Sequence, residues 1–139
     1  AARHQMVATR AAVVEAFTSA LSGDALSAEL LLFSIISRVL TRRGEAPIGK
    51  LALNISGCPA ALTAGKASPV WSSLLNILRE LLPTVYGMPL TLQKLNDSKL
   101  IPEKDYEANV LLYGELQLPA GSTLLLDETT LTPGKLTEA

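Results

Sequence analysis

The feature that most constrains this fold is a short apolar segment near the carboxyl end of the chain. Three consecutive leucines occupy residues 124–126, and Asp127 and Glu128 follow them directly. The turn-forming residues 119–122 precede this run, so it predicts a buried β-strand over residues 123–127. A buried strand needs further strands beside it and helices over its faces, and the rest of the sequence must supply both.

Three other segments have the apolar periodicity of helices. The first covers residues 5–21, and the second covers residues 25–41 directly after Asp24, a residue type that caps helix N-termini. The third begins at Pro69 and stops before Pro83. The second helix has only a narrow polar stripe, so we expect it to lie in the domain core rather than under a partner.

Shorter patterns predict the remaining strands. Leucine and isoleucine alternate with small or polar residues over residues 51–56, which is typical of a strand, and residues 90–95 predict another. Residues 110–118 are compatible with either a strand or a helix. The order of these elements favours an α/β layered fold with a mainly parallel sheet flanked by helices.

A chain of 139 residues fits one domain. We expect residues 1–45 to form its leading helices and residues 46–139 to form a strand–helix–strand core. The chain starts without methionine and stops without a terminating element, so we also expect it to be a fragment of a longer polypeptide.

Composition argues against several classes of function. The formal net charge of −1 gives none of the basic surplus that neutralises nucleic-acid phosphates, so we expect no direct nucleic-acid contact. The basic cluster of Arg38, Arg42 and Arg43 lies where the second helix should end, which favours a helix-dipole role over a phosphate or partner site. Cys58 and His4 are the sole residues of their types, so neither a disulfide nor a zinc site is expected. We also expect no membrane association, because no apolar run is long enough to span a bilayer.

The segment after the first predicted strand resembles a phosphate-binding loop that has lost its key residues. A working loop reads GxxxxGK followed by Ser or Thr, because backbone N–H groups hold the phosphates, lysine neutralises them and the hydroxyl binds magnesium. Gly57 stands at the first position, but Leu62 replaces the second glycine. Gly65 and Lys66 precede the third helix, yet Ala67 replaces the hydroxyl residue. The sequence therefore predicts no ATP turnover.

The apolar strand has the Walker-B-like form of the other half of an ATPase site. In such sites the aspartate serves magnesium and the glutamate polarises the attacking water. Without a phosphate-binding loop, we expect a degenerate site with no catalytic residue, metal or cofactor, in which the two carboxylates serve hydrogen bonding or capping. Its positions are Gly57, Gly65, Lys66, Asp127 and Glu128. The alternative is a P-loop NTPase remodelled around Gly65 and Lys66, since a helix N-terminus beside a lysine attracts anions.

Five segments carry a resemblance to a known family. They are residues 23–29 (GDALSAE), 53–59 (LNISGCP), 101–109 (IPEKDYEAN), 114–119 (GELQLP) and 126–129 (LDET). Together they resemble the minichromosome maintenance complex-binding protein family over about residues 24–133. Within that span, residues 60–67 look like a variable insertion.

This resemblance implies a nuclear, non-catalytic protein that binds subunits of the minichromosome maintenance helicase. It implies a role in assembling the helicase or removing it from chromatin, with only indirect chromatin association, and in sister-chromatid cohesion. It also implies a degenerate AAA+ fold that docks on a helicase subunit by mimicking a neighbouring subunit. A remodelled NTPase and a purely structural core that supports a binding segment elsewhere are the alternatives.

Overall fold

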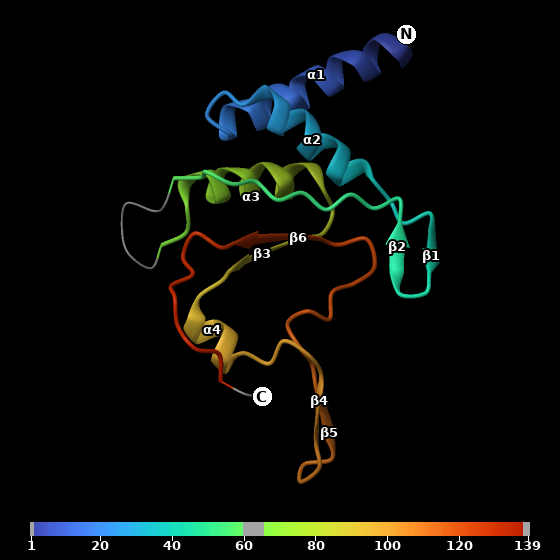
Figure 1. Cartoon of the computed structure of the whole chain (residues 1–139). Coiled ribbons are helices and arrows are strands. Elements are labelled where there is room, and N and C mark those ends of the chain that lie inside the picture. Colours follow the sequence, from blue (N-terminus) through green and yellow to red (C-terminus); the bar gives the residue numbers. More distant parts are fainter. Residues whose placement is uncertain (1, 60–65, 138–139) are drawn as a thin grey trace.

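The computed structural model describes residues 2–59 and 66–137 (Figure 1). The helices are α1 (Ala2–Ala20), α2 (Ala25–Ile36), α3 (Pro69–Leu81) and α4 (Leu92–Asp97). The strands are β1 (Thr41–Arg43), β2 (Ala46–Ile48), β3 (Val85–Pro89), β4 (Glu103–Asp105), β5 (Val110–Leu112) and β6 (Thr123–Asp127). None of the described helices is both long and apolar enough to cross a membrane.

These elements form layers that start from a pair of helices. Figure 1 shows α1 and α2 packed on each other at one end of the molecule, with α3 between them and the pair of strands β3 and β6. The β4–β5 hairpin projects from the opposite end, and the β1–β2 hairpin projects beside α2. The described strands form three two-stranded sheets, of which β3–β6 alone is parallel, and the layered AAA+ fold with a mainly parallel sheet stays a prediction.

The turn between α1 and α2 is fixed by residues that favour it. Gly23 adopts a φ of 96°, and its N–H donates to the carbonyl of Thr18 (2.8 Å), which closes the end of α1. Asp24 then caps α2, because its carboxylate accepts the N–H (3.0 Å) and the hydroxyl (2.6 Å) of Ser27. The same hydrogen bonds lower the pKa of the Asp24 carboxyl.

The main hydrophobic core lies where the three longer helices meet. Its buried members are Phe17 and Leu21 at the end of α1, Ala28 and Leu31 of α2, and Val70, Leu74 and Leu78 of α3. The prediction that the second helix is buried in the core holds for one face alone. Leu26 and Phe33 on its other face are 71% and 49% exposed.

The predicted strand over residues 123–127 is confirmed as β6, and its pairing with β3 is parallel. The N–H of Thr123 donates to the carbonyl of Thr84 (3.1 Å), and the carbonyl of Asp127 accepts from the N–H of Leu90 (2.8 Å). The strand predicted over residues 90–95 is wrong. The chain pairs five residues earlier, and Thr91 then accepts the N–H of Lys94 (3.0 Å) and caps α4.

Two further predictions fail in the amino-terminal half. The second helix ends at Ile36, because Ser37 turns to an extended conformation and the chain enters the β1–β2 hairpin. Residues 51–56 are extended but form no strand, since none of the described strands lies beside them. Alternating residues predict which side of a segment is buried, and they do not supply a pairing partner.

The ambiguous segment over residues 110–118 is a strand at its start alone. Strand β5 pairs with β4 in a hairpin, and the chain then turns at Gly114. A Cβ at Gly114 would lie 2.5 Å from the carbonyl oxygen of Leu100, so any larger residue would collide with backbone. The requirement for glycine therefore comes from close packing of two chain segments.

An exposed ion pair links α4 to the segment after β5 and gives a pH-dependent prediction. Lys94 lies 2.8 Å from the carboxylate of Glu115 and holds the pKa of that carboxyl below its ordinary value of 4.5. A lowered folded-state pKa stabilises the protein above the unfolded value, and this contribution disappears as the pH falls through the folded pKa. Replacing Lys94→Met should return the pKa of Glu115 toward 4.5 in a carboxyl NMR titration. It should cost less than about 1 kcal/mol at neutral pH.

The matched control for this pair is Lys99→Met, because Lys99 forms a separate exposed ion pair with Glu103 (2.5 Å). That variant should leave the titration of Glu115 unchanged. An unchanged titration in the Lys94 variant would instead show that the ion pair is not formed in solution.

Candidate functional site

Asp127 lies at the centre of the predicted site and is a buried carboxylate, 2% exposed. One oxygen accepts the N–H of Ser68 (3.0 Å), and the other accepts the N–H (3.0 Å) and the hydroxyl (2.7 Å) of Thr129. Ser68 directly precedes α3, and its hydroxyl donates to the carbonyl of Pro59 (2.9 Å). Asp127 therefore ties the end of β6 to the start of α3 and, through Ser68, to the segment before it.

The other predicted positions do not gather around Asp127. Glu128 and Lys66 are exposed, and within residues 2–59 and 66–137 their side chains enter no ion pair or side-chain hydrogen bond. Gly57 adopts a φ of 77° with open space around it, and Gly65 lies outside the described residues. The structure thus joins Asp127 to the helix that follows Lys66, and it uses both carboxylate oxygens in doing so.

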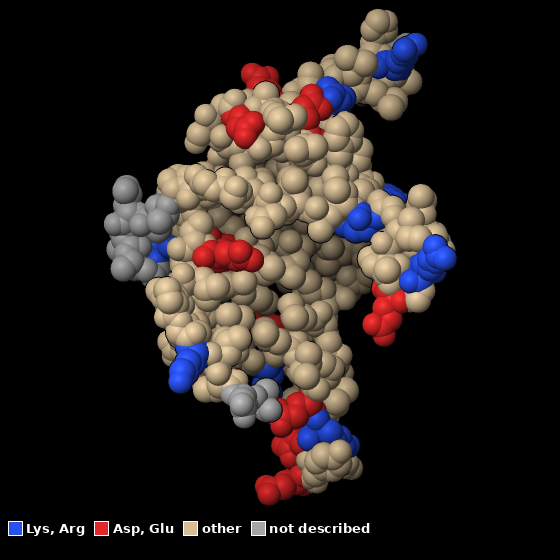
Figure 2. All heavy atoms as spheres, in the orientation of Figure 1, with Lys and Arg blue, Asp and Glu red and all other residues tan. Residues whose placement is uncertain are grey.

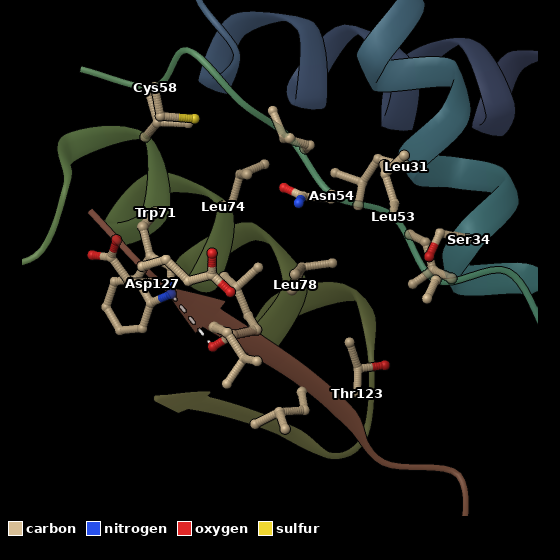
Figure 3. A pocket seen from close by; sticks show the side chains of 18 of the residues that line it. Leu31, Ser34, Leu53, Asn54, Cys58, Trp71, Leu74, Leu78, Thr123 and Asp127 are labelled. Carbon is tan, nitrogen blue, oxygen red and sulfur yellow. Dashed lines mark hydrogen bonds between the residues drawn. The ribbon is translucent and has the colours of Figure 1, made fainter. Parts of the chain in front are cut away.

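A cavity of about 820 Å³ lies next to this carboxylate. Residues 51–58 line it on one side, β6 lines it on the other, and α3 forms its base. We call it the inter-strand cavity. Figure 3 shows Leu53 and Asn54 on one side, Thr123 and Asp127 on the other, and Leu74 and Leu78 between them. Trp71 also reaches β6, since its indole N–H donates to the carbonyl of Leu125 (3.4 Å).

The lining of the inter-strand cavity is chiefly aliphatic. Leu53, Ile55 and Leu125 line it and also pack against the main core, while Asp127 lies at one end of the space. Cys58 is a free thiol on the same lining and is partly exposed. The cavity is thus suited mainly to apolar groups, and the side chains of Ser34, Asn54 and Thr123 add polar atoms to its lining.

An exposed apolar surface lies on α2, on the side opposite the core. Leu26, Leu30 and Phe33 follow one another at spacings of four and three residues, which places them on one face of the helix. They are 71%, 38% and 49% exposed, and we call them the outer stripe. The narrow polar stripe of this helix predicted burial, so the sequence analysis did not predict that these three side chains are exposed. The signal of their exposure is the excess of apolar residues over what one buried face requires.

Many charged side chains of the face shown in Figure 2 lie on the projecting hairpins. The β1–β2 hairpin carries Arg42, Arg43 and Glu45, and both signs are also mixed along β4–β5. Most of the remaining surface in this view is uncharged. The β4–β5 hairpin is net acidic, because Glu103, Asp105 and Glu107 outnumber its one lysine, Lys104.

Comparison with known proteins places this chain in a family. The family described as mini-chromosome maintenance replisome factor matches residues 1–139. The mini-chromosome maintenance complex-binding protein of Danio rerio is 39% identical over 132 residues, which cover 95% of this chain and 20% of that protein. The protein of the same name from Homo sapiens is 42% identical over 127 residues, covering 91% of this chain and 19% of its own length.

The similarity extends to insects, but it reaches no known structure. The Drosophila melanogaster protein of that name is 43% identical over 113 residues, covering 81% of this chain and 18% of its own. The chain thus spans about a fifth of the length of the curated relatives that it matches. No solved structure matches it. The match over the whole chain and the identities near 40% show that it belongs to the mini-chromosome maintenance replisome factor family.

Proposed function

We propose that this chain is a binding module that docks on the minichromosome maintenance complex through the outer stripe of α2. The observation that carries the proposal is the exposure of Leu26, Leu30 and Phe33 on a helix whose opposite face is in the core. Contiguous exposed apolar residues mark protein interaction sites, because leaving them in water is unfavourable. The relatives' name, mini-chromosome maintenance complex-binding protein, supports the identity of the partner.

The form of the outer stripe fits one mode of recognition. Residues at spacings of three and four along a helix insert into a hydrophobic groove of the partner, and they act as anchors. Phe33 is the aromatic anchor of this set, and aromatic residues contribute disproportionately to binding energy. The neighbouring ion pair of Arg10 and Glu29 lies on α1 and α2 and adds a polar border to the surface.

The proposed docking is non-catalytic and resembles that of a neighbouring helicase subunit. In this proposal the chain has a degenerate AAA+ fold and occupies a subunit interface without supplying hydrolysis. The hydrogen bonds of Asp127 support it, because both carboxylate oxygens hold the protein's own Ser68 and Thr129. The exposed Glu128 is not oriented by any described side chain. The remodelled NTPase gains no support from these contacts.

The cellular role that we propose follows from the partner. A protein that covers a subunit interface of the helicase acts in DNA replication, in the assembly of the helicase or its removal from chromatin, and thereby in sister-chromatid cohesion. It works in the nucleus and reaches chromatin through the helicase rather than by binding nucleic acid. The net charge of −1 supports the indirect route, since phosphate contacts require basic residues.

Binding measurements with purified helicase subunits test the outer stripe. The double substitution Leu26→Asp with Phe33→Asp should weaken binding at least about 30-fold, because burying two carboxylates in an apolar interface is costly. Calorimetry or a quantitative pull-down measures the change. Both side chains are exposed, so the variant should keep its fold, and circular dichroism checks this.

The matched control is Met6→Asp with Val7→Asp. These residues are 71% and 64% exposed on α1, and they add the same charge away from the outer stripe. The control should bind as the unmodified chain does. Equal loss in both double variants would point to a charge effect, and equal retention would remove the outer stripe from the interface.

A further inference from the structure

One edge of β6 faces the inter-strand cavity with unpaired backbone groups. The N–H of Thr123 donates to the carbonyl of Thr84, so the odd-numbered residues of β6 bond toward β3. Successive strand residues point their N–H and C=O groups to opposite edges, so Leu124 and Leu126 direct theirs away from β3. Among the described residues these groups have no backbone partner, since β3 is the sole strand beside β6. Unpaired backbone groups in a protein interior are unfavourable.

The extended segment on the other side of the cavity, residues 52–58, also has unpaired backbone groups. The backbone of residues 52–58 makes no hydrogen bond to any described residue, although its flanks are anchored. At one end the hydroxyl of Ser34 donates to the carbonyl of Leu51 (2.9 Å), and at the other Ser68 donates to Pro59 (2.9 Å). The segment is thus held in the shape of a strand that lacks its neighbour.

The outer edge of β3, by contrast, is not suited to pair with a further strand. The N–H of Leu90 bonds to β6, so the even-numbered residues of this region face β6 and Val85, Gly87 and Pro89 form the outer edge. Pro89 has no N–H to offer, and proline in sheets is found at edges. Pro89 thus makes β3 suited to the edge of a sheet. Strand β6 contains no proline, so it keeps every backbone donor and acceptor that an interior strand needs.

We propose that the inter-strand cavity receives one more parallel β-strand, supplied by the part of the same polypeptide that follows residue 139. It pairs with Leu124 and Leu126 on one side and with residues 52–58 on the other. Strand spacing of about 4.8 Å, a layer of about 10 Å and a rise of about 3.3 Å give about 160 Å³ per strand residue. The cavity of about 820 Å³ is therefore large enough for a short strand.

The direction of the incoming strand follows from its neighbours. Figure 1 shows residues 51–58 and β6 running the same way, and β3 is parallel to β6. Such a strand completes a parallel sheet in the order residues 51–58, new strand, β6, β3. An interior strand of a parallel sheet is buried on both faces, so the sequence that fills the cavity should be a continuous run of Val, Ile and Leu.

Two observations favour the same polypeptide as the source. The curated relatives are about five times as long as the stretch that matches this chain, which leaves ample sequence for another strand. The cavity is bordered by Leu53, Ile55 and Leu125, which belong to the packing around the main core. A strand at this depth is part of a domain's own sheet.

The described course of the chain favours a segment that follows rather than precedes it. Thr137 lies beside α4, where its N–H donates to the side chain of Asn96 (2.9 Å), and Ala2 is at the far end of α1 from the sheet (Figure 1). A parallel strand needs a crossover of a dozen or more residues. Lys135 and Thr137 both form hydrogen bonds with the side chain of Asn96 in α4, so the incoming strand begins beyond them.

Amide hydrogen exchange in the full-length polypeptide, without helicase, tests the proposal at single residues. The amides of Leu125 and Asp127 bond to β3 and serve as the internal control. If a strand fills the cavity, the amides of Leu124 and Leu126 should exchange as slowly as these two, at least about 100-fold slower than in an unstructured peptide. Fast exchange at Leu124 and Leu126 beside slow exchange at Leu125 and Asp127 would show an open edge and overturn the proposal.

Photo-crosslinking identifies the occupant. Photo-leucine in place of Leu126 in the purified full-length protein should crosslink to a segment of the same molecule beyond residue 139. Photo-leucine at Leu81, which has a similar exposure (44% against 42%), should not give this product. A crosslink from position 126 to a second molecule, or one that appears only after helicase subunits are added, would contradict the proposal. Neither result depends on whether the outer stripe of α2 binds the helicase.

Discussion

Replacing Asp127→Ala should lower the free energy of unfolding by about 3 kcal/mol, because three hydrogen bonds to a buried carboxylate disappear together. The N–H of Ser68, at a residue 1% exposed, loses its acceptor, and so do the N–H and hydroxyl of Thr129. For a domain of this size the melting temperature should fall on the order of 10 °C. Urea unfolding followed by the fluorescence of Trp71, the sole tryptophan, measures the loss.

The control for this prediction is the neighbouring carboxylate. Glu128→Ala should change the unfolding free energy by less than about 0.5 kcal/mol, because the side chain is exposed. Asp127→Asn should fall between the two, since an amide keeps one acceptor and presents a donor to the other partner. Equal stability of the Asp127 and Glu128 variants would show that the hydrogen bonds to Ser68 and Thr129 carry no weight.

Thermal unfolding in the presence of nucleotide separates a structural carboxylate from a nucleotide site. A nucleotide that binds the folded state alone raises the melting temperature in proportion to the logarithm of its concentration over Kd. Magnesium–ATP should therefore leave the melting temperature of the unmodified chain unchanged. Stabilisation that grows with the nucleotide concentration and that Lys66→Ala removes would instead support the remodelled NTPase.

The sequence predicted those features of the fold that residues close together in the chain determine, such as the starts of helices. Ser68 and Pro69 predicted the start of α3, and Asp24 predicted the start of α2, because caps act within one turn of a helix. The leucine run predicted the position of β6, although its leucines are at most partly buried and Leu126 is 42% exposed. Its partner β3 was missed, since Gly87 and Pro89 weaken the strand pattern there.

The sequence did not predict contacts between segments that lie far apart in the chain. The hydrogen bond from Ser68 to Asp127 joins residues 59 apart, and no local pattern announces it. The alternation over residues 51–56 correctly marks Leu53 and Ile55 as the inward side, but the expected neighbouring strand is missing from the described chain. The candidate site was predicted as a set of positions, and the structure shows that Asp127 alone among those described is held by several partners.

The second large effect is expected at Phe17, the largest fully buried side chain of the described core. It belongs to α1, and the core cluster places it with Leu31 of α2 and with Leu74 and Leu78 of α3. Phe17→Ala should lower the free energy of unfolding by about 3–5 kcal/mol, because it removes apolar contacts and leaves a cavity. Domains are stable by only about 5–15 kcal/mol, so much of the fold's stability depends on this contact.

Comparing the unfolding transitions seen by two probes in the Phe17 variants tells whether α1 and α2 unfold as one cooperative unit with the sheet. Phe17→Leu should recover most of the stability, and Met6→Ala should cost less than about 0.5 kcal/mol because Met6 is 71% exposed on the projecting part of α1. If the helices and the sheet unfold together, the circular dichroism and Trp71 fluorescence transitions of Phe17→Ala shift by the same amount. If helical signal is lost first while the Trp71 transition keeps its midpoint, α1 is a separate unit. The outer stripe of α2 would then be presented by a helical pair that is stable only when bound.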